Sequence, residues 1–158
     1  MKAISEYTVI AELQQVMKNA KTKNRDDVFW EAFSRVCELE GLNYSDPLHR
    51  DFYSTLKAYE ELLTEKNGRT TKASRTRQKL DRKGVIQCLE DWANNATETQ
   101  GFTLLVANDL IHLTGEYLVL KYKDQFSDKA ISNATKRLKA VETRASFVAA
   151  FDAAGINF

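Results

Sequence analysis

The sequence predicts an all-α fold, an irregular orthogonal bundle of about seven to nine helices in a single helical domain over residues 1–158. Apolar residues recur at three- and four-residue spacing through most of the chain, which is the period of an amphipathic helix. The six glycines fall mostly between these periodic segments, and the single proline, Pro47, follows an aspartate suited to cap a helix. A length of 158 residues fits one domain with its own core.

The expected helices, in chain order, cover about residues 5–19, 25–40, 47–66, 71–83, 85–95, 102–114, 116–125, 127–142 and 146–154. The inner stripe of the first is expected to contain Val9, Leu13, Val16 and Met17. The second has a broad apolar face and ends at Gly41. The third begins at Pro47 with Asp46 as its N-cap, and Gly68 stops it.

The later helices are separated by polar or glycine-containing links. The fourth is basic and ends before Gly84, and a polar link over residues 94–101 separates the apolar fifth and sixth helices. Residues 117–122 are compatible with a strand, but no second run has strand periodicity, so a helix is expected there. Ser127 caps the eighth helix, and the last ends at Gly155.

Charge is distributed unevenly along the chain. The net charge is only +1, from 23 Lys and Arg against 22 Asp and Glu. Residues 64–83 nevertheless hold eight basic and two acidic residues, a net +6 that leaves the rest of the chain at −5. Residues 84–120 contain five acids and no Lys or Arg. The charge is therefore sorted along the chain, and the near-zero total hides this.

The basic helix places its cations on one face. With 100° of rotation per residue, an arc of about 100° holds Lys72, Arg75, Lys79, Arg82 and Lys83. Arg77 lies beside a narrow apolar edge, where its stem can pack. Like charges at this spacing repel by a few tenths of a kcal/mol per pair. The helix is therefore expected to be more stable when an anion is bound to this face.

Nucleic-acid phosphate is the expected anion, and duplex DNA is the expected nucleic acid. The site residues that we expect are Lys66, Asn67, Arg69, Lys72, Arg75, Arg77, Lys79, Arg82 and Lys83. Arginine forks suit phosphate and guanine, and the absence of aromatic residues over 64–83 argues against stacking on single strands. Neutralising about five phosphates would give a slope of log K against log salt near −4.5. Further cations could widen the footprint: Lys121, Lys123, Lys129, Lys136, Arg137 and Lys139.

Other interpretations stay open at this point. The basic face could bind an acidic protein, or the acidic stretch 84–120 of its own chain or of a second copy in a homodimer. It could also be a solvated face without a function. An enzyme whose site forms only in three dimensions is the third possibility, although we expect a binding protein instead.

No pattern of residues predicts a catalytic, metal or cofactor site. Neither histidine, His49 or His112, has a partner at catalytic or metal-ligand spacing, and His112 is expected in a helix core. The two cysteines, Cys37 and Cys88, lie in apolar stretches and indicate a reducing, cytoplasmic location. No apolar run approaches the ~18 residues that cross a bilayer, so no membrane partner is expected.

Residues 59–93 carry one resemblance. The segment contains the loop Asn67-Gly68-Arg69, the helical Arg75-Thr76-Arg77, and then Gly84-Val85 and Leu89-Glu90-Asp91-Trp92-Ala93. It resembles a segment of uncharacterised bacterial proteins scattered among mobile elements. The resemblance implies that the Asn-Gly-Arg loop and the Arg-Thr-Arg helix are the working part, and it transfers no activity and no catalytic residue.

Overall fold

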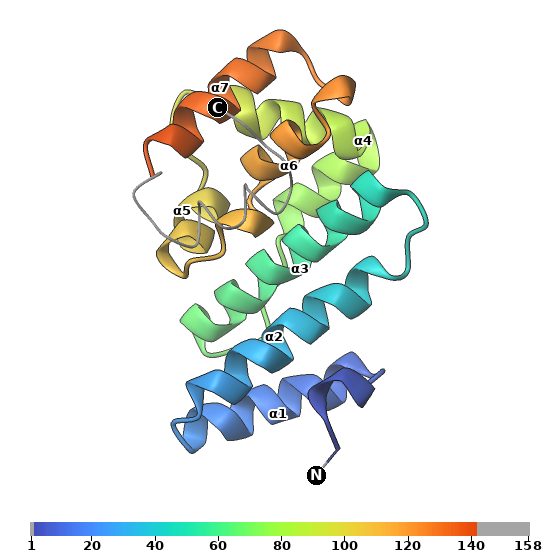
Figure 1. The fold of residues 1–158 in the computed structure, drawn as a ribbon, viewed down its shortest axis with the longest axis vertical. Helices are drawn as coiled ribbons and strands as arrows, with labels where there is room; N and C mark the ends of the chain where they lie inside the picture. The colour runs from blue at the N-terminus through green and yellow to red at the C-terminus, as the bar shows by residue number, and fades with distance from the viewer. Residues whose placement is uncertain (1, 142–158) are drawn as a thin grey trace. The chain divides into compact units, whose positions relative to one another are not determined.

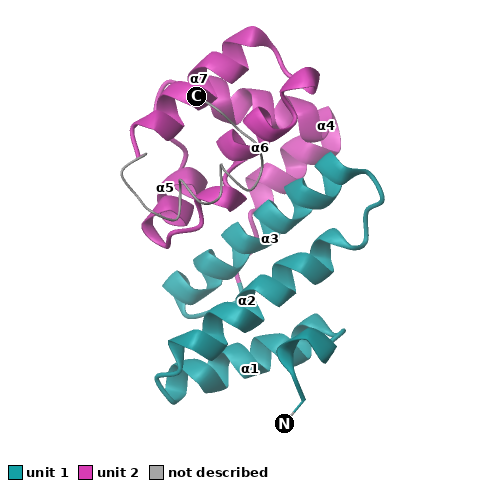
Figure 2. Cartoon of the chain, in the orientation of Figure 1, with its two compact units in different colours: residues 1–70 teal, residues 71–158 magenta. Residues whose placement is uncertain are grey.

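The all-α prediction is confirmed by a computed structural model that describes residues 2–141 (Figure 1). Seven α-helices and three short 3-10 helices cover most of these residues, and no strand occurs among them. The chain divides into two compact units, Met1–Thr70 (unit 1) and Thr71–Phe158 (unit 2), coloured separately in Figure 2. The single helical domain expected over residues 1–158 stays a prediction.

Unit 1 consists of helices that pack around a phenylalanine-rich core. It contains η1 (Ile4–Glu6), α1 (Ile10–Thr22), α2 (Asp26–Gly41) and α3 (Pro47–Asn67). Helix α2 packs against both α1 and α3. Its core side chains are buried because each lies on the apolar stripe that its helix turns inward, and the largest are Phe29, Phe33, Phe52, Leu13, Leu48 and Leu56.

The ends of α3 follow the local rules expected from the sequence. The Asp46 carboxylate accepts a hydrogen bond from the His49 backbone N–H at 3.0 Å, as an N-cap does, and Pro47 opens the helix. At the other end Gly68 adopts a left-handed conformation with φ 70° and caps the helix. The prediction of this helix is therefore confirmed at both ends.

Unit 2 packs three of its α-helices together and contains a fourth. It contains α4 (Ser74–Asn94), α5 (Gln100–Ala107), η2 (Ile111–Leu113), α6 (Gly115–Lys121), η3 (Lys123–Gln125) and α7 (Asp128–Lys139). Helix α6 packs against α4 and α7, and α4 packs against α7. The contact between α6 and α4 is close at Gly115, where an added Cβ would lie 2.6 Å from the Trp92 ring.

Two of the helix boundaries predicted from the sequence are wrong. Helix α1 begins at Ile10 rather than near residue 5, because Val9 has an extended backbone, and the Val9 side chain is 48% exposed instead of facing the core. The expected helix over 102–114 ends at Ala107, because Asp109 takes a left-handed φ of 59° that aspartate tolerates. A 3-10 turn follows, and it leaves His112 exposed rather than in a helix core.

The remaining helix predictions hold with small changes. Residues 115–121 are helical, and a 3-10 turn follows, so the helical interpretation of 116–125 is confirmed. Ser127 caps α7 by accepting from the Ala130 N–H at 3.1 Å, and the helix ends at Lys139. The helix expected over 146–154 lies outside the described residues. Within the described part of the chain, no helix is both long and apolar enough to cross a bilayer.

Candidate nucleic-acid interface

The basic segment of unit 2 is a short non-helical stretch followed by a helix of nearly three turns that ends at a glycine. Helix α4 begins at Ser74 with Ala73 as its N-cap, so Lys72 precedes the helix rather than forming part of it. Gly84 breaks α4 with φ 85° and ψ 174°, a conformation open to glycine and strained for other residues. The basic helix therefore spans residues 74–83, and an apolar helix follows in a new direction.

One face of this helix is polar, cationic and exposed. Arg75, Gln78 and Arg82 are all exposed and fall within an arc of about 60°. Neither arginine has an acidic partner among the described residues. Gln78 was not among the expected site residues, although its position between the two arginines on the helix places it on the same face. Asp81, which is also exposed, lies about 60° beyond Gln78 at the border of this face, on the side of the helix opposite to Lys79.

The other edge of the cationic face is paired within the chain. The Lys79 ammonium contacts the Asp91 carboxylate at 2.5 Å, and the Lys83 ammonium lies 3.9 Å from the same oxygen. The hydrogen bond from Lys79 lowers the pKa of the Asp91 carboxyl, and a second hydrogen bond from Gln87 at 2.7 Å acts in the same direction. Asp91 was not among the expected site residues, but it belongs to the acidic stretch 84–120, whose pairing with the basic face of the same chain was one of the open alternatives.

The break at Gly84 makes this ion pair possible. Lys79 and Asp91 are twelve residues apart, so a straight helix would hold their Cα atoms about 18 Å apart. That distance exceeds the combined reach of the two side chains. The turn at Gly84 brings the two parts of α4 together, so that an acid from the apolar part meets cations of the basic part.

The other expected site residues are distributed between the two units. Lys72 is exposed at the start of unit 2, and Arg77 is partly buried on the opposite side of the helix from Arg75. The remaining three are exposed at the end of unit 1: Lys66, Asn67 and Arg69. The structure thus brings Arg75, Lys79, Arg82 and Lys83 together on one helix and leaves these three in the other unit.

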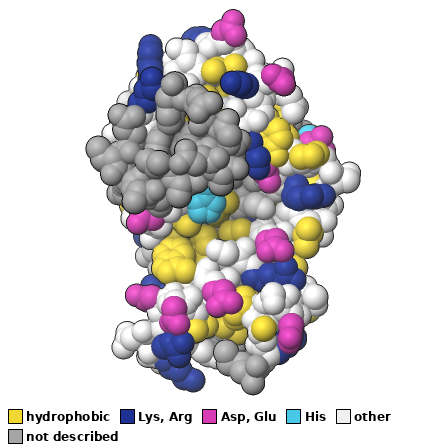
Figure 3. All heavy atoms as spheres, in the orientation of Figure 1, with side chains coloured by type: hydrophobic (Ala, Val, Ile, Leu, Met, Phe, Trp, Pro, Cys, Tyr) yellow, Lys and Arg dark blue, Asp and Glu magenta, His cyan; other side chains and the backbone are white. Residues whose placement is uncertain are grey.

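The surface outside this helix carries charges of both signs. On the face shown in Figure 3, Lys and Arg side chains lie among Asp and Glu side chains rather than in one continuous basic patch. Lys129, Lys136 and Lys139 are exposed on α7, and Lys121 and Lys123 are exposed just before it. These five lysines all lie on elements of unit 2 other than the basic helix.

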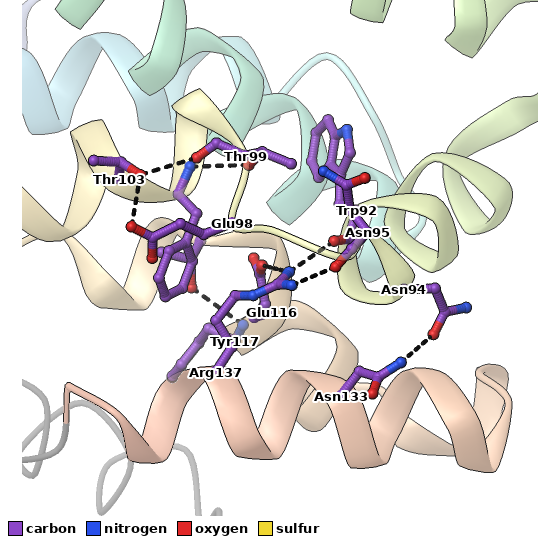
Figure 4. A network of polar contacts seen from close by, with 12 residues as sticks. Trp92, Asn94, Asn95, Glu98, Thr99, Thr103, Glu116, Tyr117, Asn133 and Arg137 are labelled. Atoms are coloured by element: carbon purple, nitrogen blue, oxygen red, sulfur yellow. Dashed lines mark hydrogen bonds and ion pairs between the residues drawn. The ribbon is translucent and has the colours of Figure 1, made fainter.

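Arg137 does not belong to the expected basic footprint, because its guanidinium group is hydrogen-bonded to other residues of unit 2. Figure 4 shows its guanidinium pointing at Glu116 and at the end of α4. Nη1 donates to the Glu116 carboxylate and to the Trp92 carbonyl, both at 2.9 Å, and Nη2 donates to the Asn95 carbonyl at 2.6 Å. The Glu116 side chain is buried, so this pair holds α7, α6 and the end of α4 together.

The acidic stretch 84–120 is used within unit 2. Glu90 accepts hydrogen bonds from the Ser127 backbone N–H and hydroxyl at 2.8 and 2.7 Å, and thereby fixes the start of α7. Glu98 accepts from the Thr103 hydroxyl at 3.0 Å. With Asp91 on the lysines and Glu116 on Arg137, the acids are mostly committed to partners in their own unit.

The histidines and cysteines form no reactive cluster in the described residues. His49 Nδ1 lies 2.7 Å from the Asp46 carboxylate at the exposed start of α3. Both cysteines are free and buried, and burial raises the pKa of each thiol. Over residues 2–141, no three His, Cys, Asp or Glu side chains gather in a way that could hold a metal ion. What the basic helix offers chemically is the binding of anions.

Comparison with family models, with curated proteins and with solved structures finds no match for the chain. The resemblance of residues 59–93 to bacterial mobile-element proteins therefore stays a prediction.

Proposed function

We propose that unit 2 binds the phosphate backbone of duplex DNA with the open edge of its basic segment, formed by Lys72, Arg75 and Arg82. The observation that carries this proposal is the pair Arg75 and Arg82. The two are exposed on one face of the helix, seven residues or about two turns apart, and neither has an acidic partner in the described part of the chain. Guanidinium groups suit phosphate oxygens because they donate two parallel hydrogen bonds.

A duplex is proposed because the segment has no aromatic side chains for base stacking and offers donors suited to phosphate. No aromatic residue occurs over residues 71–83, so a platform on which the bases of a single strand stack is missing from this segment. The Ala73 N-cap makes no side-chain cap hydrogen bond, so the first N–H groups of α4 add donors beside Arg75. These groups contact phosphate without reading sequence, and we propose binding with little base specificity.

The salt dependence follows from the number of open cations. Three phosphate contacts give a slope of log K against log salt of about −2.7, which is shallower than the value of about −4.5 expected from five contacts. A threefold rise in salt should then weaken binding roughly 20-fold.

Fluorescence anisotropy with a labelled 20-base-pair duplex tests the proposal. The double variant Arg75→Ala, Arg82→Ala should bind roughly 60-fold more weakly at 0.1 M salt, with a slope shallower by about 1.8. The matched control is Lys129→Ala, Lys136→Ala, which removes two exposed charges from α7 of the same unit. We expect its slope to stay within about 0.5 of the wild-type value. Binding that ignores salt, or that the arginine variant retains, would overturn the proposal.

Competition decides the kind of nucleic acid. Unlabelled duplex DNA should displace the probe at lower concentration than a single strand of the same length. Stronger displacement by the single strand would contradict the duplex assignment. Lys66, Asn67 and Arg69 belong to unit 1, and a separate Lys66→Ala, Arg69→Ala variant measures their contribution.

The binding of an acidic protein, or of a second copy in a homodimer, stays a prediction. Pairing between copies would set the basic helix against the acidic stretch 84–120. We place it behind nucleic-acid binding, because Glu90, Asp91 and Glu116 already have partners in their own unit. Light scattering at low and high salt tests it, and a dimer that dissociates with salt would support it.

The two free cysteines agree with the cytoplasmic location expected from the sequence.

A further inference from the structure

Two lysines of the basic helix contact an aspartate from the apolar part of α4, and the proposed function does not use this contact. Asp91 lies beyond the Gly84 break and receives the ammonium groups of Lys79, at 2.5 Å, and Lys83, at 3.9 Å. A hydrogen bond from Gln87 also holds the carboxylate. The two lysines are therefore drawn toward the body of unit 2, while Arg75 and Arg82 on the same helix remain open.

We propose that Asp91 is a positioning residue that withholds Lys79 and Lys83 from the nucleic acid and thereby limits the phosphate contacts of the segment. The inference rests on the proposed function. An aspartate carboxylate takes the place that a phosphate oxygen would otherwise occupy at these ammonium groups. The negative charge of the Asp91 carboxylate also repels a phosphate that approaches this edge of the helix.

The position of Asp91 in the fold supports this role. The carboxylate and the Lys79 side chain are both partly buried, so water screens their attraction less than it screens a fully exposed pair. The Lys83 contact is longer and more exposed, so it is the weaker of the two. We therefore expect Lys79 to be withheld more completely than Lys83.

The expected size of the effect follows from counterion release. Each lysine that gains a phosphate contact makes the slope of log K against log salt more negative by about 0.9. If affinity at 1 M salt is unchanged, one recovered contact strengthens binding about 8-fold at 0.1 M salt, and two recovered contacts strengthen it about 60-fold.

The matched pair Asp91→Asn and Asp81→Asn tests the proposal in the full chain with the same labelled duplex. Both variants remove one negative charge from α4, but Asp81 lies on the other side of the basic helix, away from Lys79. Asp91→Asn should bind about 8- to 60-fold more tightly at 0.1 M salt, with a slope steeper by about 0.9 to 1.8. Asp81→Asn should leave the slope within about 0.5 of the wild-type value. Equal slopes in the two variants would overturn the proposal.

A second measurement removes Lys79 in two backgrounds, with and without Asp91. Lys79→Gln in the otherwise wild-type chain should leave the slope unchanged, because the lysine makes no phosphate contact there. In the Asp91→Asn background the same substitution should make the slope shallower by about 0.9. If Lys79→Gln costs a full contact in the wild-type chain, Asp91 does not withhold it.

The outcome also separates this inference from the proposed function. If wild-type protein binds duplex DNA through Arg75 and Arg82 but the two aspartate variants agree, only the role of Asp91 is wrong. If wild-type protein and Asp91→Asn both fail to bind, the proposed function is wrong, and this inference fails with it.

Discussion

Replacing Arg137 by methionine should destabilise unit 2 by about 3–5 kcal/mol. The substitution keeps much of the side-chain volume and removes the charge and three hydrogen bonds. It leaves the Glu116 carboxylate, on a side chain that is 2% exposed, buried without its cation. Breaking a buried pair from one side costs about this much, because the remaining charge is neither solvated nor paired. The Trp92 and Asn95 carbonyls at the end of α4 also lose their donor.

The loss should depend on pH in a defined direction. Burial raises the pKa of the Glu116 carboxyl above its ordinary value, and the hydrogen bond from Arg137 opposes that rise. Without Arg137 the pKa rises further. The folded state then binds a proton that the unfolded state has already released, so stability falls as pH increases through the folded-state pKa. The variant should therefore be closest to wild type at acidic pH.

Urea unfolding followed by far-UV circular dichroism measures this effect, and hydrogen exchange of α6 and α7 amides assigns it to unit 2. The control is Lys136→Met on the exposed face of α7, which should change stability by no more than about 0.5 kcal/mol. Adding Glu116→Gln to Arg137→Met should recover part of the loss, because the buried group is then neutral. A loss below about 1 kcal/mol that does not vary with pH would refute the reasoning.

Three further predictions concern packing, capping and thiol exposure. Gly115→Ala should destabilise unit 2 by about 1–3 kcal/mol in urea unfolding, because its Cβ would lie 2.6 Å from the Trp92 ring; an unchanged midpoint would show that the ring moves freely. Ser127→Ala should cost about 0.5–2 kcal/mol and increase hydrogen exchange in the first turn of α7, whose N-cap it removes. Cys37 and Cys88 should react with Ellman's reagent only after unfolding, since both are buried thiols; rapid reaction of the folded protein at pH 8 would contradict their burial.

Helix boundaries that depend on neighbouring residues could be predicted from the sequence. Asp46, Gly68 and Ser127 act within one turn of their own position, and each ends or begins a helix where it was expected. Gly84 was likewise expected at the end of the basic helix, and its positive φ explains why the helix breaks there. The start of α1 and the early end of α5 were wrong, because apolar spacing alone does not show where backbone geometry leaves the helix.

The helical class, most helix ends and the concentration of cations before Gly84 could all be predicted from the residues in chain order. These depend on contacts between residues three or four apart, and composition and spacing record such contacts. Which charges remain open depends instead on how the helices pack. Asp91 reaches Lys79 across a break in the helix, and Arg137 reaches Glu116 from another helix. Pairs so far apart in the chain meet only after the helices have packed, since the energy that brings them together comes from burial elsewhere in the unit.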